Sequence, residues 1–180
     1  MEIMALPLKP QDVVVLLKLC GYKAAMRPAY SLIANELGMS QSEINASVKR
    51  LQAARLVNPK ELGELPILAA TEEFLIHAVK YVFPAERGHF VRGMPTSYAA
   101  KPLDTLIVAG DDPIPVWPDP QGKIKGISLA PLYRSVPDAA RRDSLLYERL
   151  AMLDAIRDGG ARERKLAEQE LVKSLRRTDA

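Results

Sequence analysis

The feature that most constrains this chain is the short interval between two helical segments in LGMSQSEINASVKRLQAARLV, residues 37–57. One helix ends at Leu37-Gly38, where glycine is the usual residue for the left-handed conformation that follows a helix. Another helix begins almost at once, because Ser40 and Glu43 have the S-x-x-E spacing of a capping box. The two helices must therefore meet across a very tight corner.

Apolar spacing predicts the helices on both sides of this corner. Residues 10–20 and 30–37 repeat apolar side chains at intervals of three and four, as amphipathic helices do. A third helix is predicted over residues 40–53, and three of its apolar residues fall on one narrow stripe when they are placed at 100° per residue. We expect this stripe to be its buried face: Ile44, Val48 and Leu51.

The opposite face of the helix over residues 40–53 is small and polar, which suits the major groove of DNA. Small residues let the backbone come close, amides and hydroxyls can meet base edges, and cations can contact phosphates. The first turn is where recognition helices usually make base contacts. We expect base contacts from Gln41, Ser42, Asn45 and Ala46, and phosphate contacts from Lys49 and Arg50.

This pattern resembles that of bacterial winged helix-turn-helix transcriptional regulators of the MarR group, over roughly residues 8–82. The resemblance implies a recognition helix at about residues 40–53 and a homodimer that reads a two-fold symmetric operator in double-stranded DNA. Such proteins often have glycine where this chain has Arg55, so the turn there forms differently or with strain. The matching positions are Ile33-Ala34, Leu37-Gly38, Ser40, Ile44, Val48, Lys49-Arg50-Leu51 and Leu56-Val57.

The segment that follows, NPKELGELP (residues 58–66), is either a two-stranded wing or a simple loop. It carries Lys60 against Glu61 and Glu64, whereas a wing that contacts DNA is usually basic. ILAATEEFLIHAVKYVF, residues 67–83, then predicts another helix.

Proline changes the character of the chain after this helix. Nine of the fourteen prolines lie between Pro84 and Pro137, so this region cannot be mainly helical. Within it, DTLIVAG (104–110) predicts a short buried strand, and residues 115–129 predict a hairpin around a turn at 119–122. Together with this hairpin, YVFPAERGHFVRGMPTSYAAKPL resembles part of uncharacterised bacterial proteins, which implies no activity.

Two alternatives remain open in the second half of the chain. Arg87 and Arg92, in ERGHFVRGMPTSY, could bind a phosphate or carboxylate ligand or could buttress the DNA-binding half. The chain is helical again from about residue 138 to 156 and from 161 to 175, with a break at Asp158-Gly159-Gly160. The apolar stripe of the first of these helices is either intrachain core or a dimer seam: Leu146, Leu150 and Leu153.

Composition limits the function classes. Residues 1–60 carry eight basic against four acidic side chains, so the modest positive excess of the chain, +3 overall, sits around the tight corner. The chain has a single cysteine, Cys20, so it cannot form an intrachain disulfide. The two histidines, His77 and His89, have no Cys or acidic residue at a spacing typical of metal ligands, so we expect no metal. We also expect no cofactor and no enzymatic activity, because no nucleophile–base pair or phosphate loop stands out. Short apolar runs and no signal-peptide pattern favour the cytoplasm.

The sequence therefore predicts a mainly α protein with a small β part, an α+β fold in three regions. Residues 1–83 would be the winged helix-turn-helix domain, 84–137 a Pro-rich region with short strands, and 138–180 helices that are candidates for dimerisation. The predicted function is a sequence-specific DNA-binding transcriptional regulator. The alternative is a non-enzymatic protein-interaction module or antitoxin-type partner of a neighbouring gene product, which would expose an apolar patch around Trp117 or Leu146.

Overall fold

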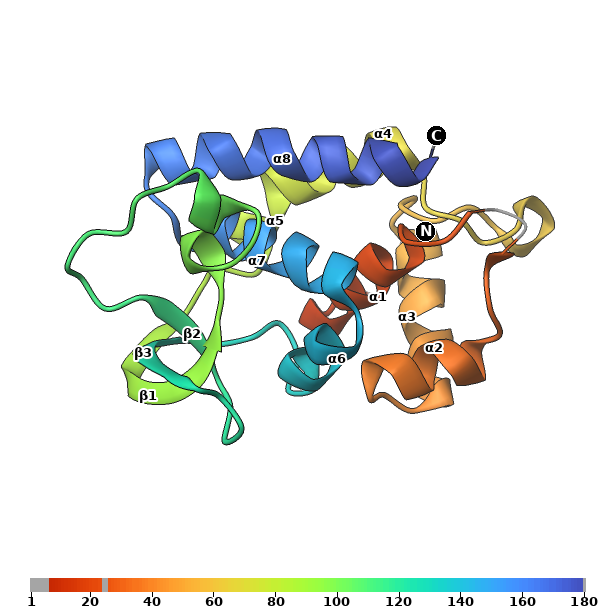
Figure 1. Cartoon of the computed structure of the whole chain (residues 1–180). Helices are drawn as coiled ribbons and strands as arrows, with labels where there is room; N and C mark the ends of the chain where they lie inside the picture. The colour runs from red at the N-terminus through yellow and green to blue at the C-terminus, as the bar shows by residue number, and fades with distance from the viewer. Residues whose placement is uncertain (1–6, 24–25, 180) are drawn as a thin grey trace.

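The computed structural model describes residues 7–23 and 26–179, which form an α+β fold. Figure 1 shows α1–α3 on one side of the molecule and a small three-stranded sheet on the other, with α7 between them and α8 across one edge. The helices are α1 (Pro10–Leu19), α2 (Tyr30–Leu37), α3 (Gln41–Ala53), α4 (Leu68–Glu73), α5 (Val79–Val82), α6 (Val136–Arg142), α7 (Ser144–Asp158) and α8 (Ala161–Asp179). The strands are β1 (Arg87–Pro95), β2 (Pro115–Pro118) and β3 (Ile124–Leu129).

The three N-terminal helices lie where apolar spacing predicts them. Gly38 ends α2 in the left-handed conformation, with φ 64°, and only residues 38–40 separate α2 from α3. The predicted stripe of α3 is buried, because α3 packs on both α1 and α2. The exposed fractions of its members are 0% for Ile44 and 1% each for Val48 and Leu51.

The start of α3 forms only half of the predicted capping box. The Ser40 hydroxyl accepts a hydrogen bond from the backbone N–H of Glu43, 3.1 Å away. The Glu43 carboxylate, however, does not return to the Ser40 backbone; it accepts bonds from Gln11 and Arg50 instead. The guanidinium of Arg50 reaches Glu43 and offers this carboxylate a charge-assisted hydrogen bond, which is stronger than a bond from a backbone amide.

The turn after α3 and the following loop resolve two alternatives. Arg55 takes the left-handed conformation itself, with φ 59°, so the turn forms with strain in place of a glycine. Residues 58–66 form a simple loop with a 3-10 turn at Lys60–Leu62 and are closed by a single isolated bridge between Val57 and Pro66. The two-stranded alternative is not what the structure shows.

The predicted helix over residues 67–83 is confirmed as one rod. α4 continues through a π-helical turn, Phe74–Ala78, into α5. Leu75 and Val79 bury one side of this rod against the core. None of the helices that the structure describes is long and apolar enough to cross a membrane.

The sheet differs from the predicted hairpin. β1 pairs antiparallel with both other strands, and β2 pairs parallel with β3, so the three strands close into a small barrel. The turn at 119–122 is present, with Gly122 N–H donating to the Asp119 carbonyl, but its two arms do not form an antiparallel pair. Closure brings backbones together at Gly93 and Gly126, where an added Cβ would stand 2.1 Å from a carbonyl oxygen of a neighbouring segment.

The predicted strand at 104–110 is wrong. Residues Leu103–Thr105 form a 3-10 turn, and the N–H of Ile107 donates to the Leu103 carbonyl, four residues back. Leu103 is buried and Ile107 packs on the core, whereas Val108 is 97% exposed. The apolar residues that reach the core are thus spaced at a helical interval, and the continuous apolar run misled the prediction.

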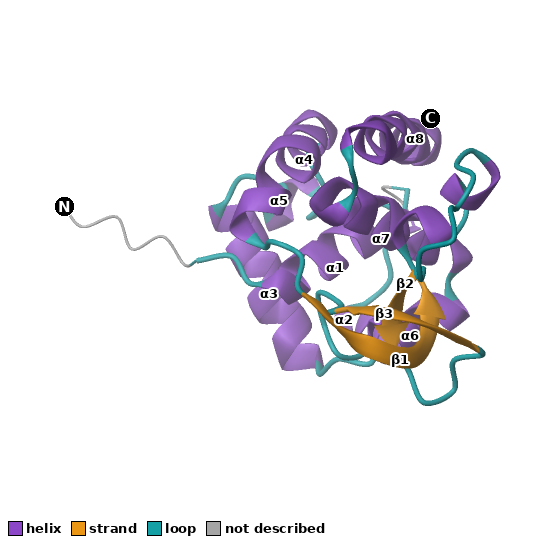
Figure 2. Ribbon diagram, turned by 90° about the vertical axis from the view of Figure 1, so that its left-hand side faces the viewer, coloured by secondary structure: helices purple, strands orange, loops and turns teal. Residues whose placement is uncertain are grey.

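The C-terminal helices pack within the chain. The predicted helix over 138–156 divides at Asp143, whose carboxylate accepts from the Leu146 N–H at 3.0 Å and caps α7. α7 lies at the centre of the molecule in both views (Figures 1 and 2) and contacts α1, α5, α6 and α8. Its leucine stripe belongs to the intrachain core and is not a dimer seam, with exposed fractions of 2% or less: Leu146, Leu150 and Leu153.

Candidate nucleic-acid interface

The outward face of α3 carries most of the residues that we predicted to contact DNA. The first turn and the middle of this face present two amides, a hydroxyl and an ammonium group to solvent, while Ala46 is half-buried. These side chains share a face because their spacing matches the helical repeat. The exposed members are Gln41, Ser42, Asn45 and Lys49.

Arg50 does not belong to this face, and our assignment of it to phosphate is wrong. Only 7% of Arg50 is exposed, and its guanidinium makes a two-pronged contact with Asp12 of α1, at 2.7 and 2.8 Å. It also donates to Glu43 at 2.7 Å and to the Ser47 hydroxyl at 3.1 Å. The long side chain starts at the flank of α3 and reaches inward to a carboxylate that is itself 0% exposed.

The charges of this buried cluster stabilise one another. The hydrogen bond to Asp12 and then the bond to Glu43 raise the pKa of Arg50, against the opposing effect of burial. Burial alone would raise the pKa of Glu43, but the bonds from Arg50 and Gln11 outweigh it and lower that pKa. Arg50 therefore joins α3 to α1 as a permanently charged structural group and fixes the orientation of the exposed face.

A hollow of about 500 Å³ lies beside the exposed face of α3. The helix supplies one wall, the start of α2 and the segment before it supply the second, and the loop after α3 supplies the third. The first wall is built from Gln41, Asn45, Val48, Lys49 and Gln52, and the other two from Arg27, Tyr30, Lys60 and Glu64.

The far walls of the hollow are tied together by an ion pair. Arg27 donates to the Glu64 carboxylate at 2.5 Å, and its guanidinium lies 5.1 Å from the ring centre of Tyr30. Burial, followed by a hydrogen bond to Glu64, raises the pKa of the Tyr30 phenol to about 12, so this phenol stays protonated at neutral pH. The second terminal nitrogen of Arg27, Nη1, is buried and has no hydrogen-bond partner within the described residues.

Two lysines give the hollow its remaining positive charge. Lys49 from α3 and Lys60 from the loop are exposed, and neither forms an ion pair with any residue that the structure describes. Sequence reasoning missed Arg27, Tyr30 and Lys60 as neighbours of α3, because only the tertiary fold brings these residues to that helix. The one signal in the sequence is the excess of basic residues before position 60.

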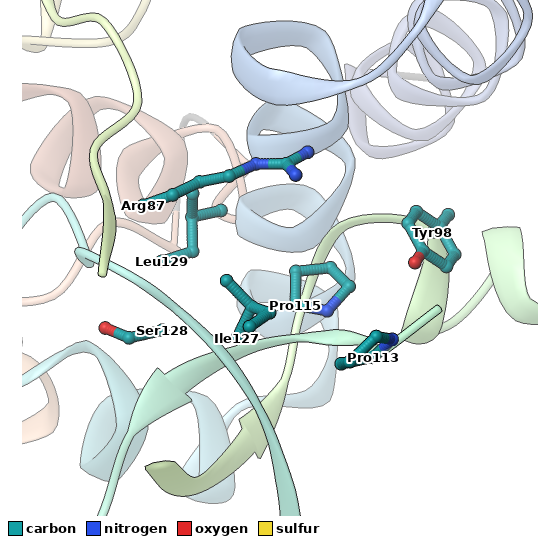
Figure 3. Close-up of a pocket in the computed structure, with 7 residues that line it drawn as sticks. All are labelled: Arg87, Tyr98, Pro113, Pro115, Ile127, Ser128 and Leu129. Carbon is teal, nitrogen blue, oxygen red and sulfur yellow. The ribbon is translucent and has the colours of Figure 1, made fainter. Parts of the chain in front are cut away.

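The second candidate site, around Arg87, is too small for a substrate (Figure 3). The cavity lies between Arg87 of β1, Tyr98, the start of β2 and the C-terminal end of β3, and its volume of about 20 Å³ is room for roughly one water molecule. Arg87 points toward α7, where it makes a two-pronged ion pair with Asp158. Arg87 therefore joins the sheet to α7, and its ion pair does not buttress the DNA-binding half.

Trp117 is a packing anchor between layers. It is 1% exposed, its ring stands 5.6 Å from the ring of Tyr147, and its indole N–H donates to Asp154 at 2.7 Å. Asp154 also accepts from Thr96 and pairs with Arg157, so the carboxylate links the strands to α7. No group of three or more metal-ligating side chains occurs in the described part of the chain.

Comparisons of the chain with protein-family models, with curated proteins and with solved structures found no match in any of the three.

Proposed function

We propose that this chain is a sequence-specific transcriptional regulator that places α3 in the major groove of double-stranded DNA and acts as a homodimer. The observation that carries the proposal is the exposed amide and hydroxyl face of α3, bordered by a cationic hollow. Gln41, Ser42 and Asn45 would face base edges, with Ala46 where the helix approaches most closely. Lys49 would contact a phosphate.

The helical geometry supports this docking. α2 and α3 meet across a three-residue corner, residues 38–40, in the manner of a helix-turn-helix with α3 as the recognition helix. The Asp12–Arg50 contact holds α3 on α1, so the exposed face is presented by a rigid unit. A site held by rigid elements positions its base contacts more accurately than a mobile loop would.

The hollow provides a natural place for the sugar-phosphate backbone that borders the groove. Lys49 and Lys60 bring two positive charges without a protein counter-ion in the described residues. Glu64 partly offsets this charge, so we assign the loop a supporting role in place of the strongly basic wing of many such regulators.

The alternative function, a protein-interaction module, was expected to expose an apolar patch around Trp117 or Leu146. Trp117 and Leu146 are 1% and 2% exposed, so neither residue forms part of an apolar docking patch.

Four single variants test the docking of α3, with DNA duplexes selected from a randomised library as ligands. Asn45→Ala should relax base preference, whereas Lys49→Ala and Lys60→Ala should weaken all sequences alike and each reduce the salt dependence of log K by about 0.9. Lys165→Ala, which removes an exposed charge from α8, should change neither property. An Asn45→Ala variant with unchanged sequence preference would refute this docking.

A further inference from the structure

A second basic surface lies on the sheet, away from α3. β1 and the segment 122–129, which contains β3, carry basic residues and no acidic ones. Arg87 is paired with Asp158, but three exposed cations remain on the two strands and the turn before β3: Arg92, Lys123 and Lys125. In Figure 1 the sheet and α3 lie on opposite sides of α7.

The register of the strands places like charges together. Arg92 of β1 stands directly opposite Lys125 of β3, an arrangement that destabilises a sheet when no counter-ion is present. Arg92 donates a hydrogen bond to the Gly122 carbonyl oxygen at 3.1 Å, and none of the three cations forms an ion pair with a described residue. Asp119, at the neighbouring turn, is already bound by Arg141. An anionic ligand would relieve this repulsion.

An exposed aromatic ring accompanies the cations. Phe90 is 58% exposed and lies two residues before Arg92, so both side chains leave β1 on the same side. Cations beside a solvent-exposed aromatic ring are the combination with which proteins bind single-stranded nucleic acid, since phosphates pair with the cations and an unstacked base lies on the ring. A duplex could use the cations but would leave the ring unused.

We propose that this surface, formed by Phe90, Arg92, Lys123 and Lys125 and here named the β1–β3 face, binds a short single-stranded segment of nucleic acid. The cations bind successive phosphates, and one base stacks on Phe90. This activity is independent of the major-groove docking of α3, because the two surfaces share no residue. It assigns the β part of the fold a binding role of its own.

Fluorescence anisotropy of the full chain with a labelled thymidine oligonucleotide of roughly a dozen nucleotides tests the proposal, with a duplex of equal length in parallel. Phe90→Ala and Phe90→Leu should each weaken single-strand binding roughly tenfold, since both remove the aromatic ring. Leucine keeps much of the apolar volume, so an equal loss in the two variants assigns the effect to stacking on the ring. Arg92→Gln combined with Lys125→Gln should lower the salt dependence of log K by about 1.4, at about 0.7 per lost phosphate contact.

Matched controls separate this surface from other parts of the chain. Tyr81→Ala removes a comparably exposed ring from α5, and Lys165→Gln removes a charge from α8; both should bind the oligonucleotide as the parent does. Lys49→Ala should also leave single-strand binding unchanged while it weakens duplex binding. Absence of single-strand binding, insensitivity to Phe90→Ala, or an equal loss with the control variants would overturn the proposal. Equal sensitivity of the duplex to Phe90→Ala would also overturn it.

Discussion

Replacing Arg50 by glutamine would leave the Asp12 carboxylate buried with one remaining hydrogen bond, from the backbone N–H of Lys9 at 2.8 Å. The guanidinium contributes two bonds to Asp12, one to Glu43 and one to Ser47, and glutamine can replace at most part of this set. An uncompensated buried charge is therefore the main consequence of the change.

The magnitude follows from the burial of both partners. Asp12 is 0% exposed and Arg50 is 7% exposed, so solvent screens their contact little. Breaking a buried pair of this kind by removing one partner costs roughly 3–5 kcal/mol of unfolding free energy. For a chain of this length, the melting temperature should fall by roughly 6–20 °C.

Urea denaturation of the parent, Arg50→Gln, Asp12→Asn and the double variant measures this effect as a thermodynamic cycle. The double variant should lose clearly less stability than the two single losses added together, because it leaves no fully buried charge without a partner. The neighbouring change Lys49→Ala should alter stability by no more than about 0.5 kcal/mol. If Arg50→Gln kept the parent's stability and instead lost DNA affinity, the structural role of Arg50 would be refuted.

Three further changes probe the fold. Arg55→Gly should stabilise the chain by roughly 0.5–1 kcal/mol in urea denaturation, since glycine adopts the left-handed turn after α3 without strain; a destabilised variant would contradict that reading. Leu150→Ala should cost roughly 2–5 kcal/mol without changing the oligomeric state in sedimentation, because the side chain fills the chain's own core. Lys18 bonds Asp143 at 2.6 Å. Burial alone would raise the pKa of Asp143, but the bonds from Lys18 and from the Leu146 backbone N–H outweigh burial and lower that pKa, so stability from its ionised form is present above its unfolded pKa of about 4 and is lost below it. Asp143→Asn should accordingly flatten the loss of stability on acidification, and an unchanged acid profile would count against this ion pair.

The N-terminal helices could be predicted because their signals are local. Gly38 marks the end of one helix, Ser40 caps the next, and the spacing of Ile44, Val48 and Leu51 identifies the buried stripe before any tertiary contact is known. Each of these features depends on residues within a few turns of one another.

The errors at Arg50 and in the sheet occur where a distant partner decides the outcome. Helical spacing places Arg50 at the flank of α3, and it becomes buried because Asp12, in another helix, supplies a countercharge. The barrel likewise depends on close backbone approach at Gly93 and Gly126, which no short segment reveals. Arg27 precedes α3 in the sequence and Lys60 follows it, yet both line the hollow beside this helix. The spacing of residues within α3 therefore carries no information about them.

The most direct test of the central claim is binding of the purified chain to the DNA upstream of its own coding sequence and to unrelated duplex of equal length, each at a low and a high salt concentration. Preferential binding to the upstream DNA that persists at the higher salt is the predicted result, because base contacts from α3 do not depend on counter-ion release. Binding that is equal for the two duplexes and vanishes with salt, or no binding at all, would contradict sequence-specific regulation through α3.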